Sequence, residues 1–302
     1  MKATAQPLSV TATPEKSWFA VLCDLVKARL TALVLMTTFV GFYLGSRGPL
    51  DLLLLLHTMI GTTILASGAS ALNQLMEREH DAKMKRTEDR PLPSGRMTPN
   101  SVLLFGAVCS VAGLVYLAFA VNLLTSFLGA MTIGSYILVY TPLKRVTTLN
   151  TAIGAIPGAL PPLMGWTASR GDITIEGWSL FAILFFWQLP HFLAIAWIYK
   201  EEYAKAGFVM LPIVDPDGYR TTRSAVSHTL GLVAVSLCPF VFHLVGPIYC
   251  VGALILGFTF LWCSIQFARK LTVRNARILF FSSILYLPLL LGLMVFDKIK
   301  IV

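Results

Sequence analysis

The chain has few charged residues for its length. Only 13% of its 302 residues are Asp, Glu, Lys or Arg, whereas 56% are hydrophobic and the mean hydropathy is +0.73. A soluble domain of this size cannot cover so much apolar surface. This shortage of charge excludes a soluble globular protein and indicates an all-α, polytopic membrane protein.

Cysteine is also scarce, and a targeting sequence is missing. The five cysteines are scattered, and no two have metal-ligand or redox spacing, which favours inert thiols. The start of the chain has neither the apolar core of a signal peptide nor the Arg-rich pattern of a mitochondrial presequence. We expect residues 1–17 to be a flexible polar tail and residues 18–302 to form a single domain, placed in a bacterial inner membrane as a multi-pass protein.

Stretches without Asp, Glu, Lys or Arg define the expected membrane spans. A span needs about 20 residues, so the two longest stretches each hold two spans, with turns near Asn122 and near Gly246-Pro247. The count predicts nine transmembrane helices, within the stretches 30–46, 52–76, 97–143, 146–169, 177–199, 224–268 and 278–296.

The positive charges orient these helices. With the N-terminus inside, twenty of the twenty-four Lys and Arg residues fall in inside segments, a strong positive-inside signal. The net charge of +9 therefore reflects membrane orientation, and no nucleic-acid partner is expected. The rule does not account for the acidic residues, which also gather in two inside loops, near 73–90 and 200–217.

The spans lack acidic residues in their middle portions. Every Asp and Glu lies at a span end. A secondary transporter is the alternative class for a polytopic protein with an interrupted helix, but proton- or sodium-coupled carriers usually place acidic groups near the bilayer midplane. This absence argues against a coupled carrier.

The first acidic cluster has helical spacing. Asn73, Glu77 and Asp81 are four residues apart, so a helix would place them on one face. Such oxygen-bearing side chains suit Mg²⁺, which binds a few carboxylates together with substrate phosphates. Asn73 and Asp81 would lie about 12 Å apart along a straight helix, too far to bind one ion directly. A solvated helix end is the simpler alternative.

A loop rich in arginine and proline follows this face. Arg86, Arg90 and Arg96 alternate with Pro91, Pro93 and Gly95, which indicates a non-helical segment dense in phosphate-binding donors. Carboxylates for Mg²⁺ beside arginines for phosphate, next to apolar spans, suit a diphosphate that carries an apolar tail.

The pattern N-x3-E-x3-D-x2-M-x-R-T-x2-R-P-L-P-x-G-R, from Asn73 to Arg96, resembles the aspartate-rich motif of the UbiA-type intramembrane prenyltransferases. Within that family it is most similar to the protohaem IX farnesyltransferase branch. The similarity covers about residues 20–215 and includes YTPLKRVTTLN (140–150), PGALPPLMGW (157–166), WQLPHF (187–192) and EYAKAGFVMLP (202–212).

This resemblance implies nine helices around a central cavity and transfer of a farnesyl group from farnesyl diphosphate to a vinyl group of haem b, giving haem O. It implies Mg²⁺ as cofactor, with haem A synthase or a terminal oxidase assembly as further partners. A sister enzyme acting on a quinone or chlorophyll precursor is the alternative. The implied site residues are Asn73, Glu77, Asp81 and Glu202 for catalysis and metal, Lys83, Arg86, Arg90, Arg96, Lys144 and Arg145 for diphosphate, and His191 for haem.

Two positions depart from the wider family, and some residues have a simpler interpretation. Gln74 stands where many members have Asp, and Glu202 stands where a second aspartate pair is usual. Lys144 and Arg145 either anchor a helix end or bind diphosphate, and Lys27 is expected to be an anchor. His191 either fixes a helix contact by a hydrogen bond or touches haem.

Overall fold

The computed structural model describes residues 16–299. The predicted flexible tail lies almost entirely outside these residues. The described chain is almost wholly helical, and the helices run as α1 (Trp18–Leu25), α2 (Ala28–Gly45), α3 (Leu52–Asp81), α4 (Pro99–Ala120), α5 (Leu123–Gly134), the π-helix η1 (Ser135–Tyr140), α6 (Thr141–Leu143), α7 (Asn150–Arg170), α8 (Ile175–Ile198), α9 (Lys200–Lys205), α10 (Leu211–Val214), α11 (Tyr219–Val235), α12 (Cys238–Val241), α13 (Pro247–Arg269) and α14 (Val273–Phe296).

The described part of the chain contains eight helical segments long and apolar enough to cross a membrane. They include Leu123–Leu143, which joins α5, η1 and α6, and Tyr219–Val241, which joins α11 and α12. The helix α7 also has the length of a span, at 21 residues, but it is rich in Gly, Pro and Thr. An all-α membrane fold is therefore confirmed, whereas a count of nine spans stays a prediction.

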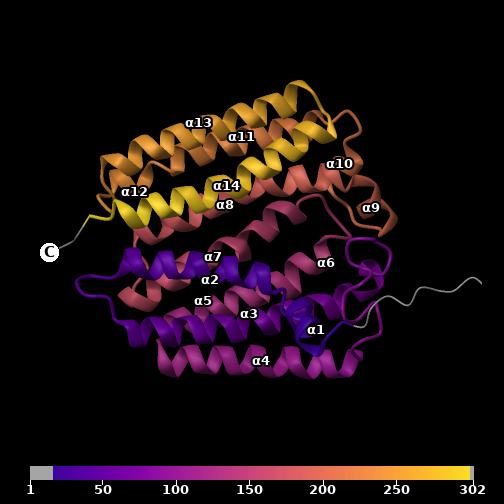
Figure 1. The fold of residues 1–302 in the computed structure, drawn as a ribbon, viewed down its shortest axis with the longest axis horizontal. Helices are drawn as coiled ribbons and strands as arrows, with labels where there is room; N and C mark the ends of the chain where they lie inside the picture. The colour runs from indigo at the N-terminus through magenta and orange to yellow at the C-terminus, as the bar shows by residue number, and fades with distance from the viewer. Residues whose placement is uncertain (1–15, 300–302) are drawn as a thin grey trace, which may run out of the picture.

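The predicted loops gather at one end of the bundle. In Figure 1 the helices α1, α6, α9 and α10, together with the loop that follows α3, lie at the right-hand end, while α12 lies at the left. The segments rich in Lys and Arg thus share one end, as the positive-inside pattern predicts. The orientation of that end in a membrane remains a prediction.

Small residues bring α2 and α7 into close contact. A Cβ atom on Gly41 would lie 1.9 Å from the carbonyl oxygen of Pro162, and one on Gly165 would lie 1.9 Å from the carbonyl oxygen of Thr38. Only glycine permits this approach of the two backbones. The contact fixes α7 at the centre of the bundle.

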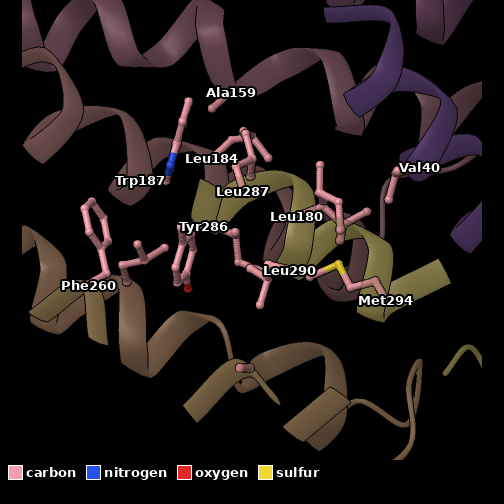
Figure 2. Close-up of a cluster of buried hydrophobic side chains, with 14 of the residues drawn as sticks. Val40, Ala159, Leu180, Leu184, Trp187, Phe260, Tyr286, Leu287, Leu290 and Met294 are labelled. Carbon is pink, nitrogen blue, oxygen red and sulfur yellow. The ribbon is translucent and has the colours of Figure 1, made fainter. Parts of the chain in front are cut away.

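The main hydrophobic cluster lies on one side of α8. Leu180, Leu184 and Trp187 of α8 pack against Tyr286, Leu287, Leu290 and Met294 of α14 and Phe260 of α13 (Figure 2). The Trp187 indole nitrogen donates a hydrogen bond to the backbone oxygen of Ser283, at 2.8 Å. This packing covers one side of α8, and other residues of the helix, such as Gln188, Phe192 and Ile195, line a cavity.

Candidate active site

A cavity of about 470 Å³ lies between α2, α3, η1, α7 and α8. Its size is within the usual range for small-molecule sites, roughly 300–1,000 Å³. One end is bounded by Tyr203 of α9 and by loop side chains such as Met84 and Phe208, and the interior is lined by apolar and small residues of the helices. A charged end thus opens into an apolar interior.

The face of α3 predicted from the sequence lines this cavity. Asn73, Glu77 and Asp81 all border it and are each at most 5% exposed, with Ser70 and Ala66 continuing the same face deeper into the bundle. The helix extends without interruption to Asp81, so the four-residue spacing holds through all three side chains. The structure therefore brings these three predicted metal ligands together on one wall.

Each of these three oxygen-bearing groups already has a cationic or hydroxyl partner. The Lys144 ammonium lies 2.6 Å from Oε1 of Glu77, and a guanidinium nitrogen of Arg90 lies 2.6 Å from Oδ2 of Asp81. The Lys27 ammonium donates to Oδ1 of Asn73 at 2.6 Å. The amide of Asn73 donates to the Thr141 hydroxyl at 3.1 Å.

The donor set fits Mg²⁺ that shares its ligands with a substrate. Among the described residues no group of three His, Cys, Asp or Glu side chains is close enough to hold a metal by itself. Glu77 and Asp81 supply two carboxylates and Asn73 an amide oxygen. Because the uninterrupted helix keeps Asn73 and Asp81 too far apart to bind one ion directly, phosphate oxygens and water, or a second ion, would bridge them.

The cavity carries an excess of positive charge. Four basic side chains line it, against two carboxylates, which gives a formal net charge of +2 from Lys27, Arg86, Arg90 and Lys144 with Glu77 and Asp81. Arg86 is held over the rings of Tyr199 and Tyr203, with its carbon Cζ 5.5 and 5.8 Å from the ring centres. This balance favours an anionic substrate.

Lys27 lines the cavity, although its position at a helix start indicated only a membrane anchor. It begins α2 with a left-handed backbone, φ 49°, an uncommon conformation for a residue other than glycine. Its ammonium points to Asn73 and Tyr136, and among the described residues it forms no ion pair. Burial and the nearby Arg90 charge lower the pKa of Lys27 to about 7. Its backbone strain is the kind that accompanies functional positions.

Lys144 is the opposite case, a lysine held firmly in its charged form. Burial opposes the charge, but the Tyr140 ring and the Glu77 carboxylate keep the pKa of Lys144 above its ordinary value. Tyr140 and Tyr136 both line the cavity, with their rings stacked at 5.8 Å. The π-helix η1 places these two rings almost one above the other beside the lysine.

Several predicted phosphate-binding residues lie outside the cavity. Arg86, Arg90 and Lys144 line it, whereas Lys83, Arg96 and Arg145 do not. Arg96 bonds to the backbone and carboxylate of Asp89, and Arg145 lies 3.4 Å from the ring of His80. The structure thus brings half of the predicted group to the site.

Glu202 and Gln74, the two departures from the family pattern, also lie away from the cavity lining. The neighbour of Glu202, Tyr203, borders the cavity, while Oε2 of Glu202 is buried and accepts no hydrogen bond from the described residues. Gln74 donates to the carbonyl oxygens of Asp24 and Leu25, at 2.9 and 2.8 Å, and so closes the C-terminal end of α1. The metal role predicted for Glu202 finds no support in this placement.

His191 lies on the packed face of α8 and does not line the cavity. Its Nδ1 is 2.6 Å from the Ser283 hydroxyl, and its ring stacks on Trp187 with centres 5.0 Å apart. Gln188, three residues before His191, and Phe192, directly after it, line the cavity instead. This geometry agrees with the simpler interpretation, a histidine that fixes the contact between α8 and α14.

We therefore expect His191→Ala to leave the absorption spectrum of bound haem unchanged while lowering the thermal stability of the purified protein. The reason is that its contacts are with Ser283, Trp187 and Phe280, at a helix interface. Titration of the variant with haem b, followed by absorbance, measures this. A shifted haem absorption band would indicate that His191 contacts the haem.

Comparison with known proteins identifies the protein family. Residues 34–285 match the model of the UbiA prenyltransferase family, which is most of the chain, and the chain belongs to that family. Solved structures share the fold. A digeranylgeranylglyceryl phosphate synthase superposes with a TM-score of 0.80 at 18% identity, covering 94% of this chain and 99% of the other. A UbiA homologue from Archaeoglobus fulgidus bound to GPP and Mg²⁺ gives 0.66 at 16%, covering 91% and 99%.

Relatives at higher identity then narrow the class. The chain is 49% identical to a protein from Solibacter usitatus over 91% of this chain and 97% of the relative. It is 40% identical to one from Koribacter versatilis over 99% of both, and 43% identical to one from Opitutus terrae over 94% and 96%. All three relatives carry the name protoheme IX farnesyltransferase.

Proposed function

We propose that this protein transfers the farnesyl group of farnesyl diphosphate to a vinyl group of haem b and so produces haem O. The observation that carries the chemistry is the cavity, where two carboxylates and an amide face four cations at the entrance to an apolar interior. The names of the relatives, at up to 49% identity over nearly the whole chain, support this donor and this acceptor.

The charged end of the cavity would hold the diphosphate. Mg²⁺ at Asn73, Glu77 and Asp81 would neutralise charge on the leaving diphosphate. Lys144, Arg90 and Lys27 pair with these same oxygens in the free protein, so ligand binding would release the cations to the phosphate oxygens. The site thus exchanges one set of charge pairs for another and avoids leaving a buried charge alone.

The apolar interior would hold the farnesyl chain and protect the allylic cation. The faces of Tyr136 and Tyr140 lie beside the charged wall, where they would attract a cation through their π electrons. The Ala residues of α3 and the Gly and Pro residues of α7 that line this region are apolar and would help to exclude bulk water. Fixed dipoles and a dry cavity are the two requirements for ionising the diphosphate productively.

The chain is a multi-pass membrane protein, and we place it in the bacterial inner membrane with the loop end of the bundle inside. A haem A synthase or a terminal oxidase assembly would receive the product. We also propose that residues 18–302 form a single domain with nine membrane spans. The shared position of the basic loops at one end of the bundle supports this orientation (Figure 1).

A direct assay tests the function. Purified protein is incubated with haem b, farnesyl diphosphate and Mg²⁺, and the pigment is examined by mass spectrometry. We expect haem O, formed only when all three are present. Farnesylation of 4-hydroxybenzoate without any change in haem would contradict the haem assignment and leave the prenyltransferase fold intact.

A further inference from the structure

One polar side chain lies in the apolar interior of the cavity without a role in the steps above. Gln188 belongs to α8, borders the cavity and is 5% exposed. It lies ten residues from the end of α8 at Ile198, which places it roughly 15 Å inside the bundle along the helix axis. An uncharged hydrogen-bonding group at this depth is costly and therefore suggests a function.

The amide of Gln188 has a defined orientation. Its nitrogen Nε2 donates to the backbone oxygens of Ala155 and Leu184, at 3.3 and 3.0 Å. Since both partners are carbonyls and accept only, the amide oxygen Oε1 must lie on the other side. That oxygen accepts no hydrogen bond from the described residues and is not fully enclosed, and the side chain borders the cavity.

The helix α7 supplies further acceptors next to this oxygen. A Cβ atom on Gly158 would lie 1.9 Å from Oε1 of Gln188, so the amide rests directly on the α7 backbone. Pro161 and Pro162 have no N–H group to donate to the carbonyls of Pro157 and Gly158. Pro157, Gly158 and Pro161 line the cavity, whereas Pro162 does not. Hydrogen-bond acceptors therefore collect here, and no donor is left over.

Such a set of acceptors suits a water molecule. A buried water needs two to four polar partners, roughly. Two acceptors would take both hydrogens of the water and leave its lone pairs directed into the cavity. A water held in this way is oriented to attack a cation.

We propose that Gln188 is a positioning residue for the water that completes the reaction; this rests on the proposed function. The bond between farnesyl C1 and the diphosphate oxygen breaks, and C1 bonds to the terminal carbon of the haem vinyl group. The cation then lies on the vinyl carbon attached to the porphyrin. The water oxygen bonds to that carbon, one of its two hydrogen bonds to the protein breaks, and that proton passes to the released diphosphate.

The same cation has a competing fate. If no water is in place, the cation loses a proton and gives an alkene that is lighter than haem O by one water. The ratio of haem O to this alkene therefore reports the position of the water, and a loss of stability alone would not change it.

The test compares product ratios of Gln188→Met with wild type, by mass spectrometry. We expect the ratio of haem O to alkene to fall by about tenfold, the factor for one hydrogen bond. Gln188→Glu keeps an acceptor and is expected to restore the ratio. Gln266→Met, the same change in α13 away from the cavity lining, is the matched control and should behave as wild type.

Gly158→Ala provides a second variant that leaves Gln188 intact, because the added methyl group would displace the amide oxygen. It should shift the ratio in the same direction. An unchanged ratio in Gln188→Met overturns the inference about Gln188. If Gln188→Met does not fold, an unchanged ratio in Gly158→Ala overturns it instead. In either case, haem O formation by the wild-type protein leaves the proposed function intact. Absence of haem O from wild type overturns the function itself.

Discussion

Replacing Asp81 with asparagine is expected to lower the rate of haem O formation by about 10²–10³-fold, the usual effect of removing one group that stabilises charge in a transition state. Asp81 is 1% exposed and lies on the cavity wall, and asparagine preserves its shape but removes its charge. Binding of haem b should persist. The measurement is turnover over a range of Mg²⁺ concentrations, with haem binding followed separately by absorbance.

The control for Asp81 lies on the same helix. Glu79 is two residues away, its side chain is 77% exposed, and it pairs with Arg78. Glu79→Gln makes the same chemical change outside the cavity and should retain wild-type turnover. Near-normal activity in Asp81→Asn would mean that this face of α3 does not bind metal.

The second large effect is expected at Lys144. Lys144→Met should lower kcat/KM for farnesyl diphosphate by about 10²–10³-fold, since it removes a cation that faces the predicted phosphate position. It also leaves Glu77 buried without its partner, which typically lowers the free energy of unfolding by about 3–5 kcal/mol. Steady-state kinetics and thermal unfolding measure these two consequences separately.

Two comparisons separate binding from stability at Lys144. Arg145 is its neighbour in sequence but does not line the cavity, so Arg145→Met should change kcat/KM by no more than about twofold. The double variant Glu77→Gln/Lys144→Met removes both charges of the pair, so it should recover stability but not activity. Recovery of activity in the double variant would show that the pair is structural only.

The sequence predicted the α3 wall correctly because a helix has a fixed period. Once residues 52–81 form one helix, side chains four positions apart must share a face, and Asn73, Glu77 and Asp81 do. The apolar stretches likewise determined the membrane class, since so few charged residues cannot cover a soluble protein. These conclusions depend only on local periodicity and composition.

Long-range packing determines which of the other predicted side chains point into the cavity. Lys27 looked like an anchor at a helix start, and only the left-handed turn before α2 directs its ammonium to Asn73, 46 residues away. Lys144 and Arg145 are equivalent in sequence, yet one enters the cavity and the other does not. The direction of a side chain at a helix junction depends on the neighbouring helices, which the local sequence does not specify.

The two faces of α8 show the same division. The sequence indicated an apolar helix with His191 and Gln188 inside it, and the histidine was the more suggestive residue because imidazole binds haem iron. The packing of α14 on Trp187 covers the face that carries His191 and leaves Gln188 and Phe192 on the cavity. By itself the sequence determined the membrane fold, the basic end and the α3 wall. The tertiary structure alone decided which cations and which polar groups of α8 line the cavity, because that depends on which face each helix buries.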